Sequence, residues 1–453
     1  MKYNIKNIFF YLCTSFFILF STACKKEINK VVQTENTFKN DSLLNSFFND
    51  LTNKGMFNGA VAIKKDGKLI FKKGYGVANF QLKTPFTPST AMEVASVSKQ
   101  FTAAAIQILA QQNKLDINEY AYKYLGNNFP YHQITIQHLL THTSGLKDYE
   151  AYFKKEWDTT TIAYNQDILN YFTESKPPLE STPGEKYHYS NSGFVLLAVI
   201  VKKVSGKTLD IFLEEYLFQL AQMNNSSFWE RDNIWTAKNY APGYMLNPKT
   251  CSFDKPELLK GKKYYTFLSG RYGSGRLSTS VNDLLKWDSI LHTPNFLNEK
   301  SKALAFTPHP PSKDPSDYGY GWHITDTTAK NKTIYHTGSW AGNKSYIKRF
   351  INTKSVIIIL NNTHSPYMVP IREEVDKYVT EGKTLNVPSL KGDDVLEKEI
   401  CNLSTENIKS WFENNKHLIW DKNDLSKLKE FYIMNNETEK SDSDNTGVAR
   451  GDE

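Results

Sequence analysis

The sequence predicts an α+β fold, an α/β sandwich in which one antiparallel sheet is built from both ends of the chain. Two apolar runs surround Lys65-Asp66-Gly67-Lys68, and Asp-Gly between such runs is a strong hairpin signal. From Thr333 onward the pattern again indicates strands, with residues 345–352 and 355–360 flanking Thr353-Lys354. The middle of the chain is mostly helical. We therefore expect helices beside the sheet, an inserted helical lobe, and a groove between the two parts.

The N-terminus has the pattern of a bacterial lipoprotein signal. Lys2 and Lys6 precede the apolar stretch from Ile8 to Phe20, which is too short for an ordinary membrane span. Small residues then lead to Cys24, although Ser21 stands where a Leu is usual. We expect cleavage before Cys24, lipidation of its thiol, and anchoring to a bacterial membrane on the periplasmic or outer face. A plain secretory signal with an incidental cysteine is the alternative.

Composition bounds the remaining organisation of the 453 residues. Hydrophobic residues make up 40% of the chain, enough for a sizeable core. Residues 381–453 carry 10 Lys and Arg against 16 Asp and Glu, whereas the other 380 residues carry 45 against 32. The lysines of this basic part are scattered and no recognised nucleic-acid motif accompanies them, so we expect no nucleic-acid partner. The oligomeric state is left open.

These observations predict five segments. They are a signal peptide (1–23), a tether (24–40), the main domain (41–385), a small helical extension (386–436) and a disordered acidic tail (437–453). Within the main domain, residues 194–204 read as a buried helix that Ser205-Gly206 would end. Whether Cys251 and Cys401 pair in the exported protein is left open.

A serine and a lysine three residues apart are the first candidate reactive groups. The pattern Ser-x-x-Lys recurs along the chain, beginning at Ser96, Ser144, Ser345 and Ser426 among other serines. Only Ser96 begins a long run with helical apolar spacing. On a helix, residues i and i+3 share a face, so Lys99 would lie beside the Ser96 hydroxyl. Burial can turn such a pair into a proton-transfer unit, whereas the alternative is a serine cap with a solvated lysine.

Two further motifs strengthen this interpretation. Tyr189-Ser190-Asn191 is the single Tyr-x-Asn triplet of the chain, and His336-Thr337-Gly338 is its single Lys/His-Thr-Gly triplet. Together with Ser96-Val97-Ser98-Lys99, they follow the order of the three motifs of penicillin-recognising serine hydrolases. Four segments between these motifs also resemble that family, namely residues 137–146, 183–194, 273–287 and 318–322. Over about residues 40–380, the chain resembles the class C β-lactamase and D,D-peptidase family, which implies a β-lactamase/transpeptidase-like fold.

The resemblance implies a role for each motif residue. Ser96 would be the nucleophile that forms an acyl-enzyme, and Lys99 and Tyr189 would share proton transfer, with either one as the general base. Asn191 would orient Lys99 and hydrogen-bond the substrate. His336, Thr337 and Gly338 would bind substrate, with His336 donating to a substrate carboxylate or to Tyr189. The backbone N–H groups of Ser96 and Ser339 would form the oxyanion hole.

No cofactor or metal is expected. His138 and His142 have helical metal-ligand spacing, but no third ligand stands out, so packing near the groove is the better interpretation. The resemblance implies hydrolysis of amide or ester bonds, and we expect the substrates to be peptides that contain D-amino acids, as for a D,D-carboxypeptidase or D-aminopeptidase. A carboxylesterase, a β-lactamase, or a catalytically weak envelope-binding or sensing protein are the alternatives. His336, where true β-lactamases commonly have a lysine, favours a peptidase or an esterase.

Overall fold

The computed structural model describes residues 40–229, 231, 234–247, 250–294, 296–326 and 332–389, together with residues 407, 410, 411, 414 and 415. The predicted signal peptide, the lipidation site Cys24 and the predicted acidic tail lie outside the described residues. So do most of the predicted tether and of the predicted C-terminal extension. Within the described part, no helix combines the length and apolar character needed to cross a membrane.

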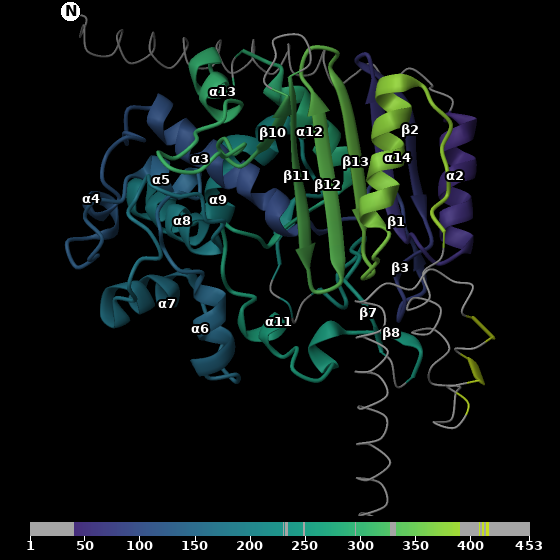
Figure 1. The fold of residues 1–453 in the computed structure, drawn as a ribbon, viewed down its shortest axis with the longest axis horizontal. Helices are drawn as coiled ribbons and strands as arrows, with labels where there is room; N and C mark the ends of the chain where they lie inside the picture. The colour runs from purple at the N-terminus through teal and green to yellow at the C-terminus, as the bar shows by residue number, and fades with distance from the viewer. Residues whose placement is uncertain are drawn as a thin grey trace, which may run out of the picture.

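Six antiparallel strands form the central sheet in the order β10-β11-β12-β13-β1-β2 (Figure 1). The strands are β1 (Gly59–Lys65), β2 (Lys68–Tyr75), β10 (His323–Asp326), β11 (Thr333–Trp340), β12 (Asn343–Phe350) and β13 (Ser355–Asn361). Strand β1 pairs with β13, which places Gly59 opposite Asn361. The two ends of the main domain therefore meet inside one sheet, which confirms the predicted architecture.

Both predicted hairpins are present. Asp66 and Gly67 form the turn between β1 and β2 with φ of 49° and 74°, values that Gly and Asp tolerate better than most residues. Lys354 precedes β13 with a φ of 54°. The strand predicted at 345–352 begins and ends two residues earlier, at Asn343 and Phe350, because the chain turns at residues 351–354.

Two helices cover one face of the sheet, α2 (Ser42–Asn53) and α14 (Met368–Glu381) (Figure 1). The Asp41 carboxylate caps α2 by accepting hydrogen bonds from the backbone N–H groups of Leu43 and Leu44, at 2.9 and 3.1 Å. The buried apolar side chains of this layer come from both helices and from the sheet, among them Leu44, Phe48, Val61, Ile357, Ile359, Ile371 and Val375.

The other face of the sheet packs against α12 (Val281–Leu291) and the helical lobe. The helices of the lobe and its surroundings are α3 (Ser98–Gln111), α4 (Tyr122–Leu125), α5 (Ile136–Leu140), α6 (Tyr149–Glu156), α7 (Asn165–Asn170), α8 (Asn191–Ser205), α9 (Leu209–Leu213), α10 (Gln219–Ala221), α11 (Tyr264–Phe267) and α13 (Glu299–Ala305). Four short helical turns accompany them: η1 (Ala95–Val97), η2 (Tyr171–Ser175), η3 (Glu214–Phe218) and η4 (Pro256–Leu258). One continuous apolar core joins this lobe to the sheet.

Helix α8 crosses the centre of that core. It ends as predicted, because Gly206 adopts a left-handed φ of 74° at its C-cap. It begins at Asn191, three residues before the predicted start, because the Ser190 side chain accepts a hydrogen bond from the backbone N–H of Ser192. The cap therefore fixes the position of the Tyr-x-Asn motif at the helix N-terminus.

Three small antiparallel sheets complete the fold. Strands β3 (Val77–Asn79) and β4 (Thr84–Pro85) form one, and β7 (Met245–Asn247) and β8 (Ser252–Asp254) form another. The third joins β5 (Met92–Glu93), β9 (Leu277–Thr279) and β6 (Ser227–Phe228). Cys251, beside β8, is disulfide-bonded, whereas Cys401 lies outside the described residues.

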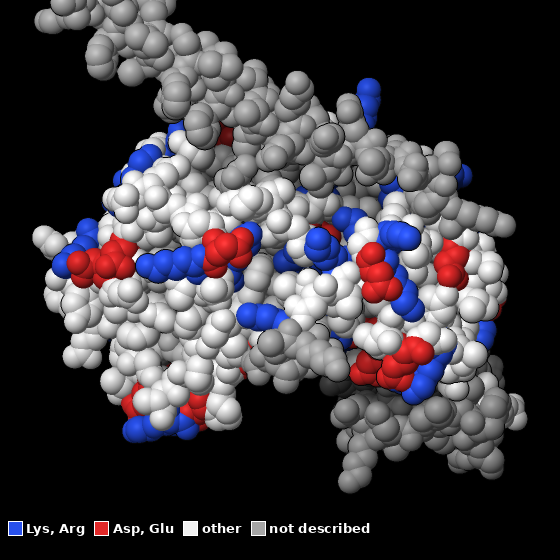
Figure 2. All heavy atoms as spheres, turned by 90° about the horizontal axis from the view of Figure 1, so that it is seen from above, with Lys and Arg blue, Asp and Glu red and all other residues white. Residues whose placement is uncertain are grey.

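Charges of both signs are interspersed on the face shown in Figure 2, and the blue and red side chains do not separate into two regions. Ion pairs near the surface of the described part include Lys123 with Glu119 and Lys377 with Glu374. Pairs of this kind contribute little to stability, because solvent screens them.

Candidate active site

Ser96 lies on the tight turn η1, where the chain passes from β5 to α3. The sequence predicted that Ser96 begins the helix, but α3 begins at Ser98 and Ser96 belongs to the preceding 3₁₀ turn. Ala95 has a φ of +48°, a left-handed value that is costly for a residue with a side chain. Ser96 itself is half-buried, so it remains partly exposed to solvent.

Strand β11 holds this turn in place. Gly338 passes so close to it that an added Cβ would lie 2.2 Å from the Val94 carbonyl oxygen and 3.1 Å from the Ser96 nitrogen. Ser345, on β12, donates a hydrogen bond from its hydroxyl to the same Val94 carbonyl at 2.7 Å. The glycine of the third motif is therefore needed for close approach of two backbones.

Lys99 follows one turn later and is completely buried. Its Nζ contacts three acceptors: Ser96 Oγ at 3.1 Å, Asn191 Oδ1 at 2.8 Å and the Ser274 carbonyl oxygen at 2.9 Å. Burial, and then the charge of Arg271, lower the pKa of Lys99 to about 7, although two nearby carboxylates oppose this effect. A substantial fraction of Lys99 is therefore neutral near pH 7 and is able to accept a proton.

Tyr189 lies beside both Ser96 and Lys99. Its hydroxyl is hydrogen-bonded to Ser96, and its ring centroid lies 4.9 Å from Lys99 Nζ. Burial raises the pKa of Tyr189 well above its ordinary value, more than the hydrogen bond to Ser96 lowers it. Tyr189 is therefore a neutral phenol in the free protein, which favours Lys99 over Tyr189 as the group that takes the serine proton.

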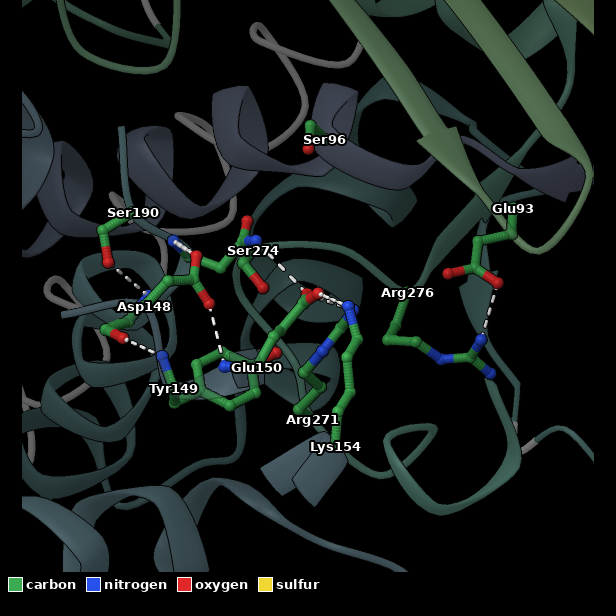
Figure 3. Close-up of polar contacts among 12 residues, drawn as sticks. Glu93, Ser96, Asp148, Tyr149, Glu150, Lys154, Ser190, Arg271, Ser274 and Arg276 are labelled. Atoms are coloured by element: carbon green, nitrogen blue, oxygen red, sulfur yellow. Dashed lines mark hydrogen bonds and ion pairs between the residues drawn. The ribbon is translucent and has the colours of Figure 1, made fainter. Parts of the chain in front are cut away.

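Asn191 connects the lysine to a group of charged side chains. Its Oδ1 accepts from Lys99, its Nδ2 donates to Glu150 Oε1 at 3.2 Å, and its backbone N–H donates to Asp148 Oδ2 at 2.8 Å. Figure 3 shows Asp148 and Glu150 near each other, with the Arg271 and Lys154 side chains converging on Glu150.

The third motif lies on β11, beyond the part of the strand that β10 covers. Strand β10 pairs with residues 333–335 of β11, so residues 336–340 have no partner strand among the described residues on that edge. Ser339 is exposed there, and Thr337 is half-buried. An open strand edge beside a half-buried serine can receive an extended peptide chain.

Both ring nitrogens of His336 already have hydrogen-bond partners within the protein. Its Nδ1 lies 2.6 Å from the Thr337 carbonyl oxygen, which requires a proton on Nδ1, and its Nε2 accepts from the Tyr318 hydroxyl at 2.9 Å. Burial, followed by the charges of His323 and Lys99, lowers the pKa of His336 well below its ordinary value. The ring is neutral and anchors the strand to Tyr318, so the predicted donation to a substrate or to Tyr189 would require it to give up one of these bonds.

His138 and His142 both make contacts within the helical lobe. The His138 side chain takes part in the N-terminal cap of α5. The His142 ring stacks on Tyr189 with centroids 4.1 Å apart, and its Nδ1 accepts from the Ser190 backbone N–H at 3.2 Å. Among the residues that the structure describes, no group of three or more His, Cys, Asp or Glu side chains could hold a metal ion.

Sequence reasoning missed Glu150, Arg271, Ser274 and Tyr318. Ser274 lies in the Gly273-Ser274-Gly275 segment, which had fitted the resemblance, yet it contributes a backbone carbonyl rather than a side chain. Glu150 follows the 137–146 segment by four residues, and its proximity to Asp148 was the one available signal. Nothing local marks Arg271, whose ion pair with Glu150 spans 121 residues.

Comparisons with known proteins match most of the chain to one family. A family model described as Beta-lactamase matches residues 44–378. Penicillin-binding protein 4* of Bacillus subtilis (strain 168) is 33% identical over 321 residues, which cover 70% of this chain and 71% of that protein. Protein flp of Staphylococcus aureus (strain MW2) is 27% identical over 346 residues, which cover 73% of this chain but 64% of that protein.

Solved structures show the same fold. A penicillin-binding protein from Bacillus halodurans aligns with a TM-score of 0.64 and 27% identity, covering 74% of this chain and 99% of that one. The D-amino acid amidase from Ochrobactrum anthropi SV3 complexed with L-phenylalanine aligns with a TM-score of 0.60 and 22% identity, covering 74% and 96%. The second likeness concerns the fold alone.

Proposed function

Because the chain belongs to the β-lactamase family and is a serine hydrolase, we propose that it is exported and hydrolyses peptides containing D-amino acids through an acyl-enzyme on Ser96. A D,D-carboxypeptidase or D-aminopeptidase reaction fits this proposal. A carboxylesterase or a β-lactamase of the same family would use the same three groups on a different substrate.

The contact between Lys99 Nζ and Ser96 Oγ, at 3.1 Å, carries the proposal. With its pKa lowered to about 7, Lys99 is poised near the pH at which a general base works best. The proton of the Ser96 hydroxyl passes to Lys99 while Oγ attacks the substrate carbonyl carbon. The Asn191 and Ser274 oxygens hold the resulting ammonium by accepting its other N–H groups.

The remaining steps use Tyr189 and the backbone. The negative oxygen of the tetrahedral intermediate faces the N–H groups of Ser96 and Ser339, and losing one such donor typically costs about 2.7–4 kcal/mol of transition-state stabilisation. Tyr189 gives its proton to the departing amine or alcohol and regains one from Lys99. A water molecule then attacks the acyl group, loses a proton to Lys99, and releases the acid while Ser96 recovers its hydroxyl proton.

Two features support a peptide as the substrate. The open edge of β11 offers main-chain hydrogen bonds to an extended chain beside Ser96. The relative of 33% identity is a penicillin-binding protein by name. His336, where true β-lactamases commonly have a lysine, agrees with a peptidase or an esterase more than with a dedicated β-lactamase.

A substrate panel tests the proposal. The mature protein and its Ser96→Ala variant would be assayed with a D-alanyl-D-alanine peptide, the matching L-alanyl-L-alanine peptide, a D-aminoacyl amide, a short-chain ester and a cephalosporin. We expect turnover of a D-amino-acid substrate that the Ser96→Ala variant loses. Turnover of the ester or the cephalosporin alone would replace the proposal with one of its alternatives.

Export rests on the sequence alone, because residues 1–39 lie outside the described part of the structure. We expect mass spectrometry of the membrane fraction to show a chain that begins at Cys24 and carries added acyl mass. A chain with a free, unlipidated N-terminus in the soluble fraction would leave only the plain secretory interpretation.

A further inference from the structure

A buried ion pair lies next to the proposed catalytic lysine. Arg271 Nη2 donates to Glu150 Oε1 at 3.2 Å, and Arg271 is only 3% exposed. Lys154, one turn after Glu150 on α6, donates to Glu150 Oε2 at 2.9 Å. Figure 3 shows the three side chains meeting at Glu150, apart from the second buried pair between Glu93 and Arg276.

Glu150 also determines which way the Asn191 amide faces. A carboxylate can only accept hydrogen bonds, so the Asn191 group that contacts Glu150 Oε1 at 3.2 Å must be the Nδ2 amine. Asn191 Oδ1 is thereby directed at Lys99 Nζ, 2.8 Å away. Without the carboxylate, the amide is free to rotate and to present its amine to the lysine, where it cannot accept.

Arg271 is held rigidly but is incompletely neutralised. Its guanidinium carbon lies 4.3 Å from the Trp340 ring centroid, which stacks against it at the end of β11. Among the described residues, its Nε and Nη1 atoms have no hydrogen-bond partner, and both are buried. Since charge in a desolvated site acts over a longer range than in water, Arg271 affects the ammonium of Lys99 directly.

Building on the function proposed above, we propose that Glu150 and Arg271 are positioning residues of the hydrolase site: Glu150 fixes the Asn191 amide against Lys99, and Arg271 sets the charge that Lys99 experiences. Among the described contacts, no hydrogen bond joins either residue to Ser96. They act through Asn191 and through the electric field at Lys99.

Besides burial and this pair, Lys99 experiences the charge of Asp148, which acts on it more strongly than that of Glu150. Asp148, at the start of α6, favours the charged lysine, as Glu150 does, and Arg271 opposes both. His142 and His336 face Lys99 from the loop after α5 and from β11, but burial lowers their pKa values well below the ordinary range and keeps them neutral. Tyr189 is kept neutral as well, since burial raises its pKa.

The test compares charge changes of opposite sign. We would measure the rate at which a fluorophosphonate labels Ser96 as a function of pH in the mature protein and its variants. The labelling rate should rise with pH as Lys99 loses its proton (the acid limb) and then level off at a plateau. Glu150→Gln removes a negative charge and should move the acid limb to lower pH by about one unit, with an about tenfold slower rate on the plateau. Arg271→Met removes a positive charge and should move the same limb to higher pH by about one unit.

Three controls separate this role from a structural one. Arg271→Lys keeps the charge and should leave the acid limb at its wild-type pH, and the double variant Glu150→Gln with Arg271→Met should return the limb close to it. Glu119→Gln removes a carboxylate that is also paired with a lysine four residues later, but on the surface, and should change nothing. Thermal melts would show which variants are folded at each pH.

The outcomes distinguish the two proposals. If the wild-type protein is not labelled at Ser96, the proposed function fails. If Ser96 is labelled but Glu150→Gln and Arg271→Met move the limb in the same direction, or not at all, the positioning role is wrong and the proposed function stands. A shift in Arg271→Lys as large as that in Arg271→Met would also contradict it.

Discussion

Gly338 and the carbonyl of Val94 are in direct contact, and this contact joins the sheet to the turn that carries Ser96. A Cβ added to Gly338 would lie 2.2 Å from the Val94 oxygen, far inside normal contact distance. Gly338 of the His336-Thr337-Gly338 motif therefore helps to position Ser96.

Gly338→Ala should accordingly impair the site. The methyl group must push η1 away from β11, and a displacement of about 1 Å at a catalytic group can cost about 10²-fold in rate. We expect kcat/KM to fall by about that factor, together with a lower Tm. Gly206→Ala is the control, because Gly206 has a left-handed φ of +74° but, unlike Gly338, nothing lies within 4 Å of an added Cβ. It should lower the Tm and leave kcat/KM unchanged, and equal loss of activity in both variants would refute the account of Gly338.

The pH dependence of kcat/KM should follow the pKa of Lys99. Below its pKa of about 7 the amine is protonated and cannot accept the Ser96 proton, so kcat/KM should rise with pH and level off above about 7. Lys99→Arg keeps the positive charge but never deprotonates, and should lower kcat/KM by about 10²–10⁴-fold at every pH. A wild-type profile that is flat from pH 5 to pH 9 would exclude Lys99 as the general base.

The stability of the fold should depend on the buried ion pairs of Asp288. Arg349 Nε, on β12, donates to Asp288 Oδ1 at 2.7 Å, and Lys64 Nζ, on β1, donates to Oδ2 at 3.2 Å. Burial alone would raise the pKa of Asp288, but the Arg349 charge, a His292 hydrogen bond and the Lys64 charge outweigh it and hold that pKa below the ordinary range. Asp288→Asn should therefore lower the free energy of unfolding by about 3–5 kcal/mol at pH 7, measured with urea.

The sign of the pH effect on this cluster is fixed by the depressed pKa. The Asp288 carboxylate stabilises the fold fully above its unfolded pKa of about 3.9, and the contribution is lost as pH falls through the lower folded pKa. The difference between wild type and Asp288→Asn should therefore shrink below about pH 4. Glu374→Gln, which breaks a partly exposed ion pair with Lys377, should cost less than about 1 kcal/mol at either pH. A larger effect from Glu374→Gln than from Asp288→Asn would show that burial is not the deciding factor.

The sequence predicted the turns and helix ends that depend on the backbone conformation of one or two residues. Asp66-Gly67 marked a hairpin because its residues accept positive φ, and Gly206 ended α8 for the same reason. Ordered motifs also brought Ser96, Lys99, Tyr189 and Asn191 together, although these residues come from α3, its preceding turn and the start of α8.

The features that sequence missed depend on distant contacts. The helix of Lys99 begins after Ser96, because Ala95 is held at positive φ in a turn packed against Gly338, over 240 residues away. The ring of His336 is engaged by Tyr318, and Glu150 by Arg271, and neither pairing leaves a periodic pattern. Side-chain hydrogen bonds of this kind are decided by the folded geometry and not by neighbours in the chain.

The most direct test of the account is to identify the residue that a fluorophosphonate modifies in the mature protein, by peptide mass spectrometry. We expect the label on Ser96, retained in Ser144→Ala, a variant of another Ser-x-x-Lys serine, and absent from Ser96→Ala, which should also lose about 10³-fold or more of turnover. Undiminished labelling and turnover in Ser96→Ala would contradict the account, and would move the nucleophile to another serine.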